Sequence, residues 1–376
     1  MTKPFSKFAE KFRRITSGGN YIPEIDGLRF MAIFWVVAWM HLPTMMNEHL
    51  FNGNLLANKY AASVVLEGGN GVSFFFMISG FILALPFIKE KVAGNKPVSL
   101  KNYYLRRLTR LEPPYLVALL IAFLLLVFYK GDSFNDQLPH LGASSVYIHN
   151  VVYNSASSVL GVAWSLEVEV QFYLLAPFLC FIFLIKNELF RRILLAALII
   201  GSAFYAWDNM WKHPVILPNF ICYFFSGMLL ADLYSSGHKL KLNSSIGLIA
   251  GLIILIGLPF LISLQSVWLA LTKLLLMITA FYLVLFNERL KKLMSLQWIT
   301  IIGGMCYSIY LLHVLIMSAV ARGLSSIFSL EGALAVIVYA IILLAAVLFF
   351  SAAFYRLIEQ PCMRRDWWKR MFSRNK

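Results

Sequence analysis

The chain has 376 residues, of which 60% are hydrophobic and only 14% are charged, and its formal net charge is +15. A soluble domain usually carries about 25% charged residues. Segments 119–129 and 244–272 contain no charged residue, which argues against soluble domains and for helices that cross a bilayer with roughly 20 residues each. We therefore predict an all-α, polytopic membrane protein.

The apolar runs predict about ten membrane-spanning helices. Two consecutive prolines, Pro113 and Pro114, are expected to open the third span, because proline fits the first turn of a helix. No cleavable signal peptide is expected, since no small-residue cleavage site follows the first apolar run. The predicted spans are 28–46, 70–88, 113–129, 168–185, 192–207, 217–234, 245–264, 267–287, 299–321 and 332–355.

The basic residues separate the loops between these spans into two classes. Of the 33 Lys and Arg residues, 27 lie in the two tails and in the loops on the same side as the tails, and 4 lie in the loops on the other side. Cytoplasmic loops of membrane proteins carry such an excess of basic residues. Both termini are therefore predicted to be cytoplasmic. The expected partner of the positive charge is membrane lipid, with no nucleic acid.

The first 20 residues carry apolar side chains at three- and four-residue spacing, at Phe5, Phe8, Phe12 and Ile15, with basic residues between them. This spacing predicts an amphipathic helix on the anionic inner leaflet, and a disordered basic tail is the alternative. The predicted domains are a basic amphipathic cytoplasmic tail over 1–20, a membrane domain over 21–362 and a basic cytoplasmic tail over 363–376.

Ionisable side chains inside membrane-spanning helices are costly, which makes them candidates for function. His41 lies at the predicted outer end of the first span, where a neutral imidazole can take a proton from a hydroxyl group; an interfacial histidine bonded to a loop carbonyl is the alternative. His313 lies midway along the ninth span, and it is either a hydrogen-bonded structural residue or a functional one. The four cysteines lie in apolar runs or beside the basic C-terminus, so we expect no disulfide framework and no metal site.

Two carboxylates lie at the predicted outer end of the fourth span, at Glu167 and Glu169. Residues two apart on a helix point about 200° apart, so only one of them can face a shared site. Glu169 shares a helical face with Tyr173, and Glu167 shares one with Trp164. Helix-start carboxylates that the helix dipole favours beside Ser165 are the alternative.

A pair of arginines, Arg107 and Arg110, precedes the third span. Three residues apart, they share one helical face. Two guanidinium groups on one face suit the binding of a phosphate group. Basic residues that only mark the inner end of a span are the alternative.

Six segments, in this order along nearly the whole chain, resemble the acyltransferase 3 family. These are the bacterial membrane O-acyltransferases that modify lipopolysaccharide O-antigen and other glycans. One such segment is a weak signal, but six in the same order are specific. The segments are IPEIDGLRFMAIFWVVAWMH, GVSFFFMISGFIL, RRLTRLEPPY, WSLEVEVQFYLLAP, GMCYSIYLLH and FYRLIEQP.

The resemblance implies a role for each residue that matches a motif of the family. Through it, His41 is the essential histidine, and Arg29 is the arginine that precedes this histidine on the first span. The resemblance thus implies His41 and Glu169 as catalytic residues, Arg29, Arg107 and Arg110 as donor-binding residues, and Ser165 as a supporting residue. The other candidate acceptor or supporting residues are Trp164, Tyr173, Glu167, Ser79 and His313.

The chain departs from the family pattern in two places. The family usually has ten residues between the arginine and the histidine, whereas eleven separate Arg29 from His41, which turns the two about 120° apart on a regular helix. Either the first span contains a π-bulge, or Arg29 does not share the histidine's site. In addition, Val170 replaces the usual acidic neighbour of the motif glutamate, so Glu167 is an alternative carboxylate.

The resemblance also implies a reaction. No cofactor is bound permanently, and the donor is acetyl-CoA or another acyl-CoA from the cytoplasm, whose phosphates Arg107 and Arg110 hold. His41 then deprotonates a hydroxyl of a glycan or lipid-linked glycan at the outer face, or briefly carries the acyl group, while Glu169 orients the imidazole or the acceptor. The expected location is the bacterial cytoplasmic (inner) membrane.

A transporter or flippase without covalent chemistry is the alternative function. Ten spans, polar residues within the bundle and basic cytoplasmic loops also fit such a protein. The internal repeat that is typical of transporters is missing from the sequence. The oligomeric state is left open.

Overall fold

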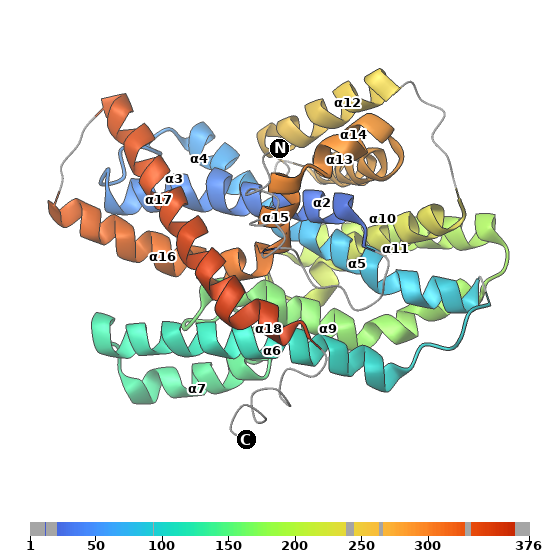
Figure 1. Cartoon of the computed structure of the whole chain (residues 1–376), viewed down its shortest axis with the longest axis horizontal. Helices are drawn as coiled ribbons and strands as arrows, with labels where there is room; N and C mark the ends of the chain where they lie inside the picture. Colours follow the sequence, from blue (N-terminus) through green and yellow to red (C-terminus); the bar gives the residue numbers. More distant parts are fainter. Residues whose placement is uncertain are drawn as a thin grey trace.

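The computed structural model describes residues 12, 21–92, 94–237, 244–262, 266–327 and 332–364. Within these residues every regular element is a helix (Figure 1), which confirms the all-α prediction. The predicted amphipathic helix over 1–20, apart from Phe12, and all but two residues of the predicted tail over 363–376 lie outside the described residues.

The α-helices carry the labels used in Figure 1, and η marks a 3-10 or π segment. In chain order they are α2 (Pro23–Phe34), η1 (Trp35–His41), α3 (Leu42–His49), α4 (Lys59–Leu66), η2 (Glu67–Gly69), α5 (Asn70–Lys91), α6 (Leu100–Leu124), η3 (Leu125–Lys130), α7 (Phe134–Ser145), α8 (His149–Tyr153), η4 (Gly161–Ala163), α9 (Trp164–Leu179), η5 (Cys180–Leu184), α10 (Glu188–Asn209), η6 (Leu217–Asn219), α11 (Ile221–Ser235), α12 (Ser244–Gly257), η7 (Leu258–Phe260), α13 (Val267–Phe286), α14 (Glu288–Met294), α15 (Gln297–Gly304), α16 (Cys306–Ile327), α17 (Gly332–Phe354), η9 (Tyr355–Glu359) and α18 (Gln360–Cys362).

Eight helical stretches among the described residues are long and apolar enough to cross a membrane, so the chain is a multi-pass membrane protein. The predicted sixth and seventh spans fall on two shorter apolar stretches, Ile221–Ser235 and Ser244–Phe260. The count of ten spans and the cytoplasmic side of the termini stay predictions. The eight stretches are Pro23–His49, Lys59–Lys91, Leu100–Lys130, Gly161–Leu184, Glu188–Asn209, Val267–Phe286, Cys306–Ile327 and Gly332–Cys362.

The two prolines of the third span do not open its helix, and that prediction is wrong. α6 begins at Leu100, where the Ser99 hydroxyl accepts a hydrogen bond from the Asn102 amide, and both prolines lie inside it. A proline removes a backbone hydrogen bond, but neighbouring helices and side chains can satisfy the freed groups in a membrane-spanning helix. The helix therefore starts well before the apolar run and carries the arginine pair on its first turns.

α7 folds back along α6 instead of staying at its end (Figure 1). The Tyr115 hydroxyl donates to the Ser144 carbonyl oxygen at 2.9 Å, and the rings of Phe123 and Phe134 lie 5.5 Å apart. Tyr115 precedes the end of η3 by fifteen residues, or about 22 Å of helix. The segment that leads into α9 therefore returns deep along the bundle.

The centre of the bundle is formed by α5 packed against α11. A Cβ atom on Gly80 of α5 would meet the backbone of Phe224, and one on Gly227 of α11 would meet the backbone of Met77. Small residues allow the two helix backbones to approach this closely, which is how membrane helices gain packing energy. α5 is thereby fixed as one wall of the site described below.

Two pairs of opposite charges are buried in the bundle. Lys273 of α13 lies 2.5 Å from Glu67 of η2, with both side chains less than a tenth exposed. At the other end, Arg191 of α10 donates twice to one carboxylate oxygen of Asp232 of α11, at 2.9 and 2.6 Å. An unpaired charge here would carry a large desolvation cost, so these pairs fix how the helices meet.

Candidate active site

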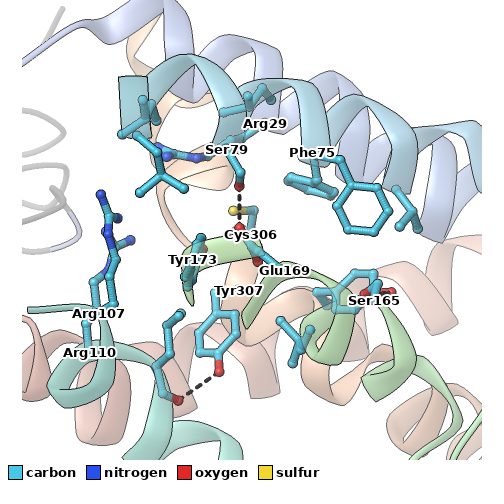
Figure 2. Close-up of a pocket in the computed structure, with 18 residues that line it drawn as sticks. Arg29, Phe75, Ser79, Arg107, Arg110, Ser165, Glu169, Tyr173, Cys306 and Tyr307 are labelled. Atoms are coloured by element: carbon cyan, nitrogen blue, oxygen red, sulfur yellow. Dashed lines mark hydrogen bonds between the residues drawn. The ribbon is translucent and has the colours of Figure 1, made fainter. Parts of the chain in front are cut away.

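Five helices, α2, α5, α6, α9 and α16, surround a narrow pocket of about 100 Å³. Figure 2 shows its polar side chains converging from the different helices. They are Arg29, Ser79, Arg107, Arg110, Ser165, Glu169, Tyr173, Tyr307 and Tyr310, together with the thiol of Cys306.

Glu169 is the carboxylate of this pocket. The Ser79 hydroxyl donates a hydrogen bond to it from the facing helix (Figure 2). Tyr173, one turn further along α9, lines the same pocket, as the four-residue spacing predicted. The guanidinium carbon of Arg107 lies 5.6 Å from the centre of the Tyr173 ring. The pocket therefore pairs an acidic and a basic group across an aromatic ring.

A second, open cleft adjoins the first pocket at the start of α6. Arg107 and Arg110 line both cavities, so the two spaces meet at this arginine pair. Lys89, Lys96 and Arg106 add three further cations to the cleft, and no carboxylate is among its described lining residues. The cleft lies on the side where the loop charges predict the cytoplasm. It is suited to a polyanion.

The first span changes its helical form between Arg29 and His41. Trp35–His41 is a π-helix, and the Leu42 amide at its end bonds the carbonyl of Val37, five residues back. A π segment takes up one extra residue in a helix. The two side chains therefore return to within about 20° of one face instead of 120°. The predicted π-bulge is confirmed, but Arg29 lines the pocket and His41 does not, so the alternative that Arg29 does not share the histidine's site stays open.

His41 forms a pair with His313 of α16. Nε2 of His313 lies 3.1 Å from Nδ1 of His41, and the rings meet edge to face with centroids 4.7 Å apart. The Tyr310 ring lies 5.7 Å from the ring of His313, and Tyr310 lines the pocket, whereas neither histidine does. The histidine pair therefore lies behind the Tyr310 wall of the pocket.

The family model of the acyltransferase 3 family, described as an acyltransferase domain, matches residues 22–356 of the chain. The chain belongs to the acyltransferase 3 family. The match includes all five helices that surround the pocket and the π segment with His41. The resemblance of the six sequence segments is thereby confirmed.

Relatives of this acyltransferase 3 chain include O-acetyltransferases. It is 25% identical to the O-acetyltransferase OatA of Staphylococcus aureus, over 97% of this chain and 60% of the relative. It is 28% identical to the peptidoglycan O-acetyltransferase OatA of Listeria monocytogenes, over 54% of this chain and 31% of the relative. The chain thus spans less than two thirds of the length of these relatives. No solved structure matches it.

Within the acyltransferase 3 fold, the two predicted catalytic residues have different surroundings. Glu169 lies in the pocket with the arginines. The side chain that contacts the imidazole of His41 is that of His313, although we expected Glu169 to orient either that imidazole or the acceptor. The sequence could not distinguish these partners, because they are contributed by helices far apart in the chain.

Glu167 points away from the pocket, as the 200° argument required for one of the two carboxylates. Glu167 is fully buried and accepts a hydrogen bond from the backbone N–H of Asn150 at 2.6 Å. Trp164 packs against the rings of Phe76 and Phe220. Glu167 thus ties α9 to α8, whereas Trp164 packs α9 against α5 and the start of α11. Glu167 does not line the pocket as an alternative carboxylate.

Tyr310 is a pocket residue that the sequence analysis missed. Its hydroxyl lies 2.8 Å from the hydroxyl of Ser165, which was predicted to support the site. The signal was present, because Tyr310 precedes His313 by three residues and so shares its helical face. Among the residues that the structure describes, no three His, Cys, Asp or Glu side chains gather as a metal site would require.

Proposed function

We propose that this protein is a membrane O-acetyltransferase that takes the acetyl group of cytoplasmic acetyl-CoA and transfers it to a hydroxyl of a cell-surface glycan. The observation that carries the proposal is the pair of adjoining cavities, a cationic cleft and a mixed pocket, which meet at Arg107 and Arg110. Membership of an acyltransferase family and the names of the relatives support the reaction class.

The donor half of the proposal rests on charge. Coenzyme A carries three phosphate groups at one end and the reactive thioester at the end of a long, uncharged arm. The five cations of the cleft match the phosphates, since arginine and lysine are the side chains that bind them best. The arm then passes Arg107 and Arg110 and carries the thioester through the pocket, past Glu169, to the Tyr310 wall behind which His41 lies. No permanently bound cofactor is needed for this route.

The acceptor half rests on His41. In the proposed step, a ring nitrogen of His41 takes the proton of the acceptor hydroxyl, and the oxygen attacks the thioester carbonyl. The carbon–sulfur bond breaks, and the imidazolium returns its proton to the leaving thiolate. Arg29 and His41 are about 18 Å apart along their helix, so the donor's anionic end and the acceptor stay on opposite sides of the bundle.

We propose a glycan or lipid-linked glycan as the acceptor, and the bacterial cytoplasmic membrane as the location. A relative that is a peptidoglycan O-acetyltransferase favours a cell-wall glycan among the candidates. O-antigen, lipopolysaccharide and exopolysaccharide share the same chemistry, a sugar hydroxyl on the outer side of the membrane.

Cys306 offers a direct test of the donor site. It is partly accessible and lines the pocket, whereas Cys180, Cys222 and Cys362 are buried. In purified protein, N-ethylmaleimide should alkylate this thiol, and acetyl-CoA should slow the reaction. Acetyl-pantetheine, which lacks the nucleotide phosphates, should protect only at much higher concentration. The Cys306→Ala variant, which should lose the label, identifies the thiol. Equal alkylation with and without acetyl-CoA would contradict the donor site.

The chemistry itself is tested with labelled acetyl-CoA. Inside-out membrane vesicles that contain the protein and candidate glycans should form an acetylated glycan. The His41→Ala variant should lose this transfer while it keeps membrane insertion and the protection of Cys306. Full activity of this variant would remove His41 from the mechanism. Movement of a substrate across the membrane without covalent transfer would instead support the transporter alternative.

A further inference from the structure

The proton arrangement of the His41–His313 pair follows from its backbone contacts. Nδ1 of His313 lies 2.7 Å from the carbonyl oxygen of Tyr310 and 3.2 Å from that of Ile309. A carbonyl oxygen only accepts hydrogen bonds, so this nitrogen must carry a proton. In the neutral ring, the other nitrogen of His313, Nε2, then presents a lone pair.

The same reasoning applies to His41. Its Nδ1 lies 3.0 Å from the carbonyl oxygen of Val36, and it faces the Nε2 lone pair of His313 at 3.1 Å. Both neighbours are acceptors, so Nδ1 of His41 carries the proton and shares it between them. The reverse arrangement would place two unprotonated nitrogens against carbonyl oxygens. One tautomer of each ring therefore satisfies all four contacts.

We infer that His313 is a positioning residue for acyl transfer, because it holds His41 in the tautomer whose Nε2 is free to accept the proton of the acceptor hydroxyl. This inference rests on the proposed function and deepens it. Nε2 of His41 makes no hydrogen bond to any described residue, and the side chain is only half-buried, while that of His313 is completely buried.

The pair also favours the charged form of His41 that arises during transfer. When Nε2 takes the proton, the bond from Nδ1 of His41 to Nε2 of His313 becomes charge-assisted and stronger. An interaction that strengthens only as the proton moves lowers the barrier of the step rather than tightening substrate binding. His313 does this without becoming charged itself and without touching the substrate.

The π segment is what makes the arrangement possible. The Val36 carbonyl oxygen that Nδ1 of His41 contacts lies five residues back, inside the π segment Trp35–His41. The ring of His41 therefore folds back onto its own helix while its edge meets α16. The same insertion that returns Arg29 and His41 to one face also supplies the carbonyl that, with His313, defines the tautomer.

The test compares two substitutions of His313. In His313→Gln the side-chain oxygen can reach the position of Nε2 and still accept from His41, whereas His313→Leu fills the space without an acceptor. A hydrogen bond to a group that becomes charged contributes about 1.5–3 kcal/mol, which is about 10- to 140-fold in rate. We expect His313→Leu to lower kcat by that factor at an unchanged KM for acetyl-CoA, and His313→Gln to recover most of it.

A spectroscopic readout separates positioning from a purely structural role. Nitrogen-15 NMR of protein labelled at histidine, assigned with His41→Gln, should show Nδ1 of His41 protonated in the wild type and in His313→Gln. In His313→Leu a second tautomer, protonated at Nε2, should appear. An unchanged His41 signal in His313→Leu would overturn the inference, as would a kcat equal to that of the wild type.

Failure of the inference is distinguishable from failure of the proposed function. Absence of acetyl transfer by the wild-type protein would contradict the function, whatever His313 does. Transfer that is normal in the wild type and in His313→Leu would contradict only the role of His313. If both His313 variants lost thermal stability and activity to the same degree, the residue would be structural and the inference would be wrong.

Discussion

Arg107 gives the sharpest quantitative prediction, because its neighbour Arg106 is a matched control. The two arginines carry the same charge and differ in where their side chains point. Arg107 lines both cavities, and its guanidinium lies between two rings, 5.9 Å from Tyr103 and 5.6 Å from Tyr173. Arg106 is exposed and lines the cleft but not the pocket. Its side chain donates a hydrogen bond to the Asn102 carbonyl oxygen of its own helix. Substituting each by alanine removes the same charge from different places.

The expected magnitude follows from the kind of contact. A hydrogen bond to a charged group contributes about 1.5–3 kcal/mol, which is about 10- to 140-fold in affinity. Arg107→Ala should raise the KM for acetyl-CoA by this factor, and Arg107→Lys, which keeps the charge but loses the planar fork, should lie between it and the wild type. An exposed ion pair is worth about 0–1 kcal/mol, so Arg106→Ala should raise KM by at most about fivefold.

The assay measures initial rates of labelled acetyl transfer in inside-out vesicles at increasing acetyl-CoA concentrations. Protection of Cys306 from alkylation gives an independent affinity for the same ligand. An unchanged KM in Arg107→Ala, or an equal rise in Arg106→Ala, would refute the placement of the donor phosphates at the junction of the two cavities.

Three further predictions concern buried polar groups. Glu169→Gln should lower acetyl transfer strongly. Glu167→Gln should leave the rate nearly unchanged, because glutamine can still accept the hydrogen bond from the backbone amide of Asn150. Equal losses of the two variants in initial-rate assays would contradict the different roles. Asp232→Ala leaves the buried guanidinium of Arg191 without its carboxylate and should destabilise the protein by about 3–5 kcal/mol, seen as a lower melting temperature in detergent. Burial, with a smaller contribution from nearby His140, lowers the pKa of His149, although the hydrogen bond that its ring donates to the Ser155 carbonyl oxygen raises it. Because the unfolded state then binds more protons below about pH 6.5, the melting temperature should fall as the pH drops from about 7 to about 5, and less so in His149→Gln.

Hydropathy located the membrane helices well, because crossing a bilayer requires about 20 consecutive apolar residues whatever the rest of the fold does. Eight of the predicted spans coincide with long apolar helices. The prediction failed at the start of α6, where the helix extends through the basic residues of the arginine motif to the cap at Ser99. The two prolines lie within the third span but not in the first turn of its helix. Proline is possible inside a membrane helix because neighbouring groups satisfy the backbone groups that it frees.

The residues of the pocket were largely predictable, but their grouping was not. Arg29, Ser79, Glu169 and Tyr173 were all named from motifs and share one cavity. The spacing between Arg29 and His41 allowed two interpretations, because a sequence does not state where a π turn forms. Only the structure shows that the π segment lies at Trp35–His41.

The sequence by itself determined an all-helical membrane protein of the acyltransferase 3 family, because apolar run length and motif order are local properties of the chain. Only the tertiary structure decided that His41 contacts His313, 272 residues away, and that Glu169 receives a hydrogen bond from Ser79, 90 residues away. Such partners depend on the rotation of each helix about its axis and on which faces pack. That choice is made by the fit of side chains across the whole bundle, at contacts such as Gly80 against Phe224.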